Sequence, residues 1–222
     1  MTKKIFFIFL LALFVCATAF AEGNDRWQWY ASTSRVNEYF DTQTLQYDSS
    51  TNSAKVWIKI TNPDGTIRFM SERNIIFPLK KFHVIKDVFP SNNYSTLNYP
   101  STGLELISPD SPDEALVNKI ADRIGIPHIY KGDVSRWKQI DTKNGISYYV
   151  ATDTIEYDAN TGLTSIWFKY INQETGRTKT YLYYCDFEKH LVGTGPTGLA
   201  EPVPDTLGEI VYNTAYGLST EK

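Results

Sequence analysis

Histidine and cysteine are the side chains that most often bind metals or act as nucleophiles, and this chain has few of them. Its three histidines are His83, His128 and His190, and no two of them are four residues apart. Neither of the two cysteines lies at a zinc-ligand spacing from a histidine. The sequence therefore predicts no metal site, and no motif in it indicates a cofactor.

Cys185 could act as a nucleophile with His190, because catalytic partners need to meet only in space. The surrounding sequence, Tyr181 to Phe187, is typical of a strand, and the acidic Asp186 would raise the pKa of the thiol. We interpret Cys185 as a buried, unreactive thiol, with an intermolecular disulfide as the alternative. The chain also lacks a Gly-x-Ser-x-Gly elbow, a P-loop and a Gly-x-Gly-x-x-Gly motif, so no catalytic residue is predicted.

One stretch of the chain, residues 68–86, is basic, with five Lys and Arg side chains and a histidine against the single acid Glu72. In a net-acidic protein such a patch could bind an anionic partner. Solvated lysines at a strand edge are the simpler interpretation, because they discourage edge-to-edge pairing. The candidate binding residues are Arg68, Arg73, Lys80, Lys81 and Lys86.

Trp57 and Trp167 each precede a lysine by two residues, Lys59 and Lys169. Exposed tryptophans can stack on sugars or peptides, but the recurrence of the same pair favours packing in a shared core. The two lysines are then expected over or beside these indole rings.

These tryptophans belong to an internal repeat. A shift of 110 residues aligns 39–62 with 149–172 without a gap, with 9 identities in 24 positions. The same shift aligns the two Arg-Trp pairs that precede these stretches. A repeat of this length indicates two related structural units. The recurring tryptophans are Trp27, Trp57, Trp137 and Trp167.

A second block repeats at a shift of 95 residues, where Pro109-Asp110-Ser111 aligns with Pro204-Asp205-Thr206. Glu114 and Glu209 follow at the same distance and complete a capping box, in which a hydroxyl and a carboxylate bind free amides at a helix start. The sequence therefore predicts a helix after each block.

The elements of each copy follow from local pattern. The helices are expected to end near Gly125 and Gly217. The first copy is longer than the second, and its extra residues lie mostly in 89–104, whose composition is typical of a loop. The β-branched and aromatic residues of the repeat predict strands at 37–47, 55–60, 66–77, 147–157, 165–170 and 177–185. The predicted fold class is α+β: two similar domains, each an antiparallel β-meander sheet with a C-terminal helix packed on it.

Residues 1–21 have the features of a secretory signal peptide: two lysines, an apolar run and Ala19-Phe20-Ala21. Cleavage there leaves 201 residues with a formal charge of −5 and one cysteine. No later run is long and apolar enough to span a bilayer, and an acidic chain is a poor nucleic-acid binder. Cys16 does not follow a small residue, so no lipid anchor is expected. The domains are repeat 1 at 22–125, a linker at 126–136 and repeat 2 at 137–222.

The repeated theme comprises Thr-x-Thr-(Leu/Ile)-x-Tyr-Asp, a Trp-x-Lys strand and Pro-Asp-(Ser/Thr)-x-x-Glu before a helix. This theme resembles the bacterial surface-adhesin protein E family over nearly the whole mature chain. The resemblance implies small exported β-rich domains, some of which bind host matrix and serum proteins. Family members often pair a strand cysteine with one at the end of the final helix. In the second copy, Cys185 fits the first position but Tyr216 lies near the second. In the first copy, Phe77 aligns with Cys185. This disulfide is therefore expected to be absent from both copies.

The signal peptide, the repeat, the missing catalytic motifs and the resemblance leave three functions open. The leading one is an exported, non-enzymatic, adhesin-like protein, periplasmic or surface-associated, that binds a protein or glycan. The alternative is an envelope structural or accessory protein with a partner in the same cell. A hydrolase that uses Cys185 or a carboxylate pair is the least favoured. Self-association, including through Cys185, is open.

Overall fold

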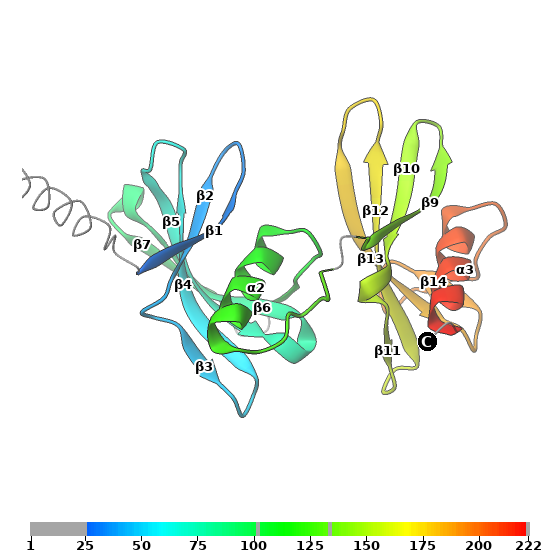
Figure 1. The fold of residues 1–222 in the computed structure, drawn as a ribbon, viewed down its shortest axis with the longest axis horizontal. Helices are drawn as coiled ribbons and strands as arrows, with labels where there is room; N and C mark the ends of the chain where they lie inside the picture. Colours follow the sequence, from blue (N-terminus) through cyan, green and yellow to red (C-terminus); the bar gives the residue numbers. More distant parts are fainter. Residues whose placement is uncertain (1–25, 101–102, 133–134, 221–222) are drawn as a thin grey trace, which may run out of the picture. The chain divides into compact units, whose positions relative to one another are not determined.

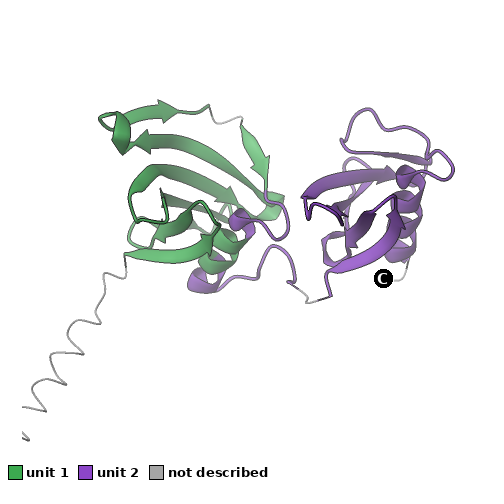
Figure 2. Ribbon diagram, turned by 90° about the horizontal axis from the view of Figure 1, so that it is seen from above, with its two compact units in different colours: residues 1–106, 115–120 green, residues 107–114, 121–222 purple. Residues whose placement is uncertain are grey.

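The structure is a computed structural model, and it describes residues 26–100, 103–132 and 135–220. The chain forms two compact units, shown in Figure 2. Unit 1 consists of residues 1–106 and 115–120, and unit 2 of residues 107–114 and 121–222. The predicted signal peptide, 1–21, lies outside the described residues. Within the described residues, no helix has the length and apolar character needed to cross a bilayer.

Unit 1 contains an eight-stranded antiparallel sheet. Its main path runs in the order β1 (Trp27–Ser32), β2 (Asn37–Asp41), β4 (Ser53–Thr61), β5 (Ile67–Ile76), β6 (Lys81–Phe89) and β7 (Ser95–Asn98). Two short strands lie off this path: β3 (Gln46–Asp48) pairs with β4, and β8 (Leu104–Leu106) pairs with β6.

Unit 2 contains a six-stranded antiparallel sheet of the same plan. Its path runs in the order β14 (Leu191–Gly193), β13 (Thr178–Asp186), β12 (Leu163–Asn172), β10 (Ile146–Ala151) and β9 (Trp137–Lys143), and β11 (Glu156–Asp158) pairs with β12. β12 corresponds to β4, so the repeat found in the sequence is a repeat of the fold.

Each sheet is followed by a helix, α2 (Pro112–Ile124) or α3 (Leu207–Thr220), as Figure 1 shows. In α2, the Ser111 hydroxyl accepts the amide of Glu114 at 3.1 Å, and the helix ends at Gly125, whose φ of 74° requires glycine. Leu116, Val117 and Ile120 from α2 are buried. The predicted α+β class is confirmed.

The alternation predicted for the central strands is confirmed. Val56 and Ile58 are fully buried, whereas Trp57 and Lys59 on the other face are half-exposed. The core of unit 2 joins the two elements, because Val150, Ile166 and Phe168 from the sheet form one apolar cluster with α3 residues. The α3 residues in this cluster are Val211, Tyr212 and Ala215.

Four sequence expectations need correction. The stretches 37–47 and 147–157 are each two short strands and not one, because a turn or a 3-10 helix interrupts them; in the first, Asp41 accepts the amide of Gln43. Residues 89–104 are not simply a loop, because they contain β7, which pairs with β6. Helix α3 continues past Gly217 to Thr220, since this glycine adopts helical φ.

The fourth correction concerns the position in the first copy that corresponds to Cys185. Cys185 pairs with Thr164 across β12 and β13, and the matching pair in unit 1 is Ala54 with Ile75. Ile75, and not Phe77, is therefore its counterpart. Both residues are fully buried, which explains why the position accepts an isoleucine or a thiol.

We expect Phe168→Ala to lower the free energy of unfolding of unit 2 by about 3–5 kcal/mol, because it empties a large site in a closed core. Urea denaturation followed by tryptophan fluorescence would measure this. Tyr157→Ala is the control: its side chain is exposed, and we expect a change of less than about 1 kcal/mol. Equal effects of the two substitutions would contradict this core assignment.

Candidate functional site

The five basic residues of the 68–86 stretch do not form one patch. Cross-strand pairing places Arg73 opposite Val56, on the face of the sheet that carries the core, where its guanidinium stacks on Phe82 at 4.7 Å. Lys86 pairs with Glu72 on the other face. Arg68 is exposed on β5, Lys80 is in a left-handed turn after the 3-10 helix Phe77–Leu79, and Lys81 begins β6. Because side chains alternate between the two faces of a strand, basic residues that are close in the sequence lie on different faces of the sheet.

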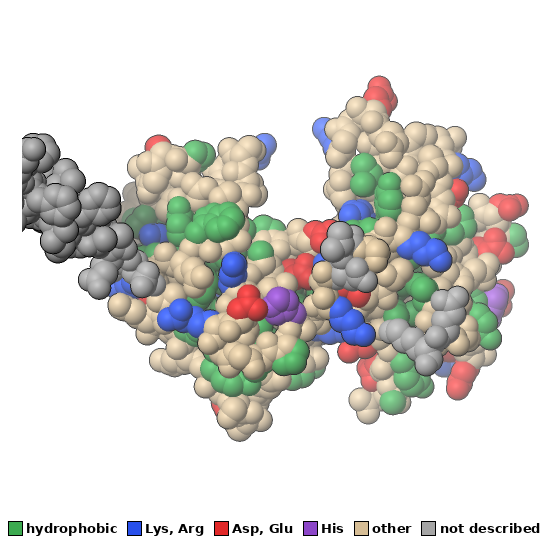
Figure 3. All heavy atoms as spheres, viewed as in Figure 1, with side chains coloured by type: hydrophobic (Ala, Val, Ile, Leu, Met, Phe, Trp, Pro, Cys, Tyr) green, Lys and Arg blue, Asp and Glu red, His purple; other side chains and the backbone are tan. Residues whose placement is uncertain are grey.

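Lys86 is also neutralised where it lies. Its ammonium is 3.1 Å from Glu72, and Lys55 is 2.9 Å from the other oxygen of the same carboxylate. Burial alone would raise the pKa of Glu72, but the hydrogen bonds and charges of the two lysines outweigh burial and lower this pKa. On the face that Figure 3 shows, basic side chains are interspersed with acidic ones.

Lysine–aromatic contacts cover the outer face of the first sheet, with different partners from those expected. Lys59 lies over Trp27 at 4.5 Å and over Tyr39 at 5.0 Å, whereas Lys86 lies over Trp57 at 5.0 Å. Tyr39 is the cross-strand partner of Lys59, and Trp57 is its neighbour on the same strand. Cross-strand neighbours are closer than residues i and i+2, which explains the contact with Tyr39; Trp27 lies one strand further, on β1.

The same contact recurs in unit 2. Lys169 lies over Trp137 at 3.8 Å and over Tyr149 at 5.9 Å. Trp167 is buried, and its indole NH donates to the Tyr130 hydroxyl at 3.0 Å. Packing of Trp167 is thus confirmed, although its partner Tyr130 comes from the predicted linker.

A buried ion network begins at Arg136, the residue before Trp137. Its guanidinium donates two hydrogen bonds to the Glu114 carboxylate, at 2.7 and 2.9 Å, and one to Asp153 at 3.1 Å. The three side chains are 6%, 8% and 5% exposed. The hydrogen bonds to Glu114 and the surrounding carboxylates raise the pKa of Arg136 despite burial.

Glu114 therefore does more than cap a helix. One of its oxygens accepts the Asp110 amide at 2.7 Å while the same carboxylate binds Arg136. Asp110 in turn contacts three groups: the Arg136 guanidinium at 3.2 Å, the Trp137 indole NH, and the Lys169 ammonium at 3.6 Å. Sequence analysis missed this network; its signal was the recurrence of Arg-Trp in both copies.

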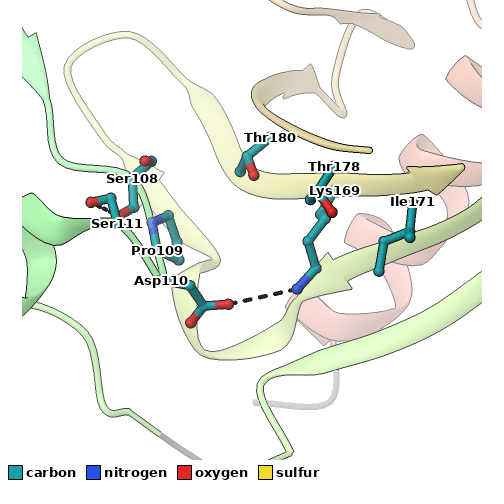
Figure 4. A pocket seen from close by; sticks show the side chains of 8 residues that line it. All are labelled: Ser108, Pro109, Asp110, Ser111, Lys169, Ile171, Thr178 and Thr180. Carbon is teal, nitrogen blue, oxygen red and sulfur yellow. Dashed lines mark hydrogen bonds and ion pairs between the residues drawn. The ribbon is translucent and has the colours of Figure 1, made fainter. Parts of the chain in front are cut away.

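A cavity of about 350 Å³ opens beside Asp110 and Lys169, as Figure 4 shows. Its walls also include Ile171, Thr178 and Thr180 from the sheet. The ion pair across its floor satisfies both charged groups, so the cavity has no unpaired charge to attract a ligand.

A larger groove, of about 550 Å³, lies between strands of the second sheet and the start of α3. We call it the tyrosine groove; its lining includes Tyr148, Tyr170, Arg177, Lys179 and Leu207. Arg177 and Lys179 are exposed, and no carboxylate among the described residues lies within 4 Å of either. The sequence offered only a weak signal for it: two basic residues in a strand that runs beside tyrosine-rich strands.

The histidines are dispersed: His83 is buried near the Gly103 carbonyl, His128 contacts Asp122, and His190 meets Tyr212 edge to face. Among the described residues no three potential ligands gather in a metal-binding group. Cys185 is fully buried, and burial raises its pKa to about 12. A disulfide to another chain would therefore require local unfolding.

Comparisons with protein-family models, with curated proteins and with solved structures find no match to this chain.

We expect Glu114→Gln to destabilise unit 2 by about 3–5 kcal/mol, because it leaves the buried Arg136 guanidinium with an incomplete set of carboxylates. Urea denaturation would measure the loss. The control is Asp122→Asn, which removes an exposed carboxylate beside His128, with an expected loss of less than about 1 kcal/mol. A loss below about 1 kcal/mol for Glu114→Gln would refute the role assigned to the network.

We expect native Cys185 to react slowly with a thiol reagent such as 5,5′-dithiobis(2-nitrobenzoate) between pH 7 and pH 9. Below its pKa of about 12 the thiol is protonated, and burial blocks the reagent as well. The measurement is absorbance of the released thiolate with and without denaturant. Fast reaction of the native protein, at the rate of the unfolded chain, would show that the sulfur is accessible.

Proposed function

We propose that this chain is an exported, non-catalytic protein that binds an acidic polymer, a glycan or a polypeptide, in the tyrosine groove of unit 2. The observation that carries the proposal is the pair of exposed cations, Arg177 and Lys179, beside half-buried tyrosines with no described carboxylate in ion-pair range. The signal-like sequence of residues 1–21 supports export.

The rings of the groove are held in place by other aromatic side chains. Tyr170 stacks on Tyr181 with ring centroids 6.1 Å apart, and Tyr148 stacks on Phe168 at 5.9 Å. A ring fixed in this way loses little conformational freedom when a sugar or a peptide group packs on it. Flat rings next to free cations suit a ligand with apolar faces and carboxylate or sulfate groups.

Features of the buried residues support a binding protein over a hydrolase. The thiol of Cys185 is protonated and covered, and the carboxylates of the Arg136 network already bind the guanidinium. A nucleophile or general base needs access to its substrate, which Cys185, Glu114 and Asp153 lack because their side chains are buried.

The resemblance to surface-adhesin protein E domains favours a partner outside the cell. A partner within the envelope is the alternative. Labelling of intact cells with a membrane-impermeant reagent distinguishes the two: labelled chain supports the external partner, and labelling only after lysis supports the internal one.

The binding test uses Arg177→Glu combined with Lys179→Glu. Because the substitution replaces both groove cations with acids, we expect at least tenfold weaker binding to an acidic ligand. Biolayer interferometry would measure residues 22–222 against two immobilised probes, heparin and poly-L-glutamate; the probe that binds tells glycan from polypeptide.

The matched control reverses two exposed lysines elsewhere in unit 2, Lys131→Glu with Lys138→Glu, which changes the net charge equally. We expect this control to bind nearly as well as the unmodified chain. Equal losses in both variants would indicate non-specific charge attraction, and no saturable binding to either probe would refute the groove as an acidic-polymer site.

A further inference from the structure

Unit 2 contains a bound segment, and both sides of its contact recur elsewhere in the chain. The docking segment, residues 107–114, places Asp110 and Glu114 against the receiving site formed by Arg136, Trp137 and Lys169. Repeat alignment gives a second docking segment, residues 202–209, and a second receiving site, Arg26, Trp27 and Lys59. The described residues show no partner segment at either of these.

The second docking segment has the conformation of the first. Asp110 and Asp205 both have φ of 60°, and their amides donate to Glu114 at 2.7 Å and to Glu209 at 2.9 Å. The next hydroxyl, of Ser111 or Thr206, donates to a carbonyl three residues earlier at 2.6 Å in both cases. Residues 202–209 are therefore preorganised to make the contact that 107–114 makes.

The second receiving site also has the geometry of the first. Lys59 lies over Trp27, as Lys169 lies over Trp137, and the carbonyls of Arg26 and Arg136 accept amides at 2.7 and 2.8 Å. Arg26 binds Asp41 through Nε and Nη2, which is the role of Asp153 at Arg136. Its Nη1 therefore remains for a second carboxylate.

The free surfaces are those that the contact would cover. Pro109 is buried in the first docking segment, whereas its counterpart Pro204 is exposed, and the preceding Val203 is 60% exposed. The Arg26 side chain is 45% exposed, against 6% for Arg136. Among the described residues, no acceptor lies at the Trp27 indole NH and no carboxylate within 4 Å of Lys59.

We propose that this chain associates head-to-tail with a second copy of itself. Asp205 of one molecule pairs with Lys59 and the Trp27 indole NH of the next, and Glu209 pairs with Nη1 of Arg26. Because the two surfaces are different, the contact is heterologous, and it builds chains or closed rings. This interaction uses neither Arg177 nor Lys179, so it stands apart from ligand binding in the tyrosine groove.

The association between separate molecules is expected to be weak. Tethering within one chain gives a docking segment an effective concentration of the order of millimolar, which a second molecule lacks. The test therefore uses residues 22–222, which contain every described residue, in sedimentation velocity up to about 1 mM. We expect the sedimentation coefficient to rise with concentration, and the rise to shrink at high salt.

Two single variants separate this contact from other modes of association. Asp205→Lys removes the docking side and keeps the receiving side; Lys59→Glu does the reverse. Each alone should show at least tenfold weaker self-association, while an equimolar mixture of the two should associate again, because the docking side of one variant and the receiving side of the other are both intact. Glu174→Lys and Lys119→Glu, at exposed positions, are the charge-matched controls and should associate as the unmodified chain does. Far-ultraviolet circular dichroism confirms that each variant is folded.

Carbodiimide crosslinking, which joins amines to nearby carboxylates, would locate the contact directly. We expect mass spectrometry to find an intermolecular bond between Lys59 and Asp205 or Glu209, and to find it only between the complementary partners in the mixture. A chain that stays monomeric to about 1 mM would overturn the proposal. So would variants that self-associate as strongly as the unmodified chain, or a mixture that stays monomeric.

Discussion

The buried guanidinium of Arg136 is the constraint on which much of unit 2 depends. A charge this far from water is costly unless carboxylates surround it, and here Glu114 and Asp153 do so. Because Glu114 also accepts the Asp110 amide, one interaction fixes the segment before α2 relative to the start of β9. The bond to Asp153 adds the 3-10 helix Thr152–Thr154 to the same assembly.

The repeat shows which parts of this arrangement belong to the sheet alone. Trp57 and Trp167 both donate their backbone amides to a threonine hydroxyl 13 residues earlier, at 3.3 and 3.1 Å. The Arg-Trp pair and the lysine over the indole recur as well. The two sites differ in the second carboxylate, Glu114, which is present only at Arg136. The sheet therefore forms this arrangement without a docked segment, and the segment 107–114 adds to a site that the sheet already provides.

Elements with a local, periodic sequence pattern could be predicted. Elements that form only through pairing with another strand were harder to predict. The central strands and α2 follow from alternation and from the Ser111 cap, as the structure confirms. Strand β7 was missed because Ser95–Asn98 has no apolar pattern; its pairing with β6 makes it a strand. The proposed patch at 68–86 divides between the two faces because side-chain direction alternates, and Lys59 contacts Trp27 across strands rather than Trp57 along its own.

The tyrosine groove and the Arg136 network were beyond sequence analysis for the same reason: their members meet only through tertiary structure. Lys59 and Lys169 occupy matching positions in the two copies but have different surroundings. Burial lowers the pKa of both Lys59 and Lys169, because removing water from around each ammonium disfavours its charged form. At Lys169 the carboxylate of Asp110 opposes this cost, although the charge of Arg136 adds to it. At Lys59, Arg26 adds repulsion and the attraction of Asp41 opposes it only in part. A carboxylate that reaches Lys59 would oppose this cost, as Asp110 does at Lys169.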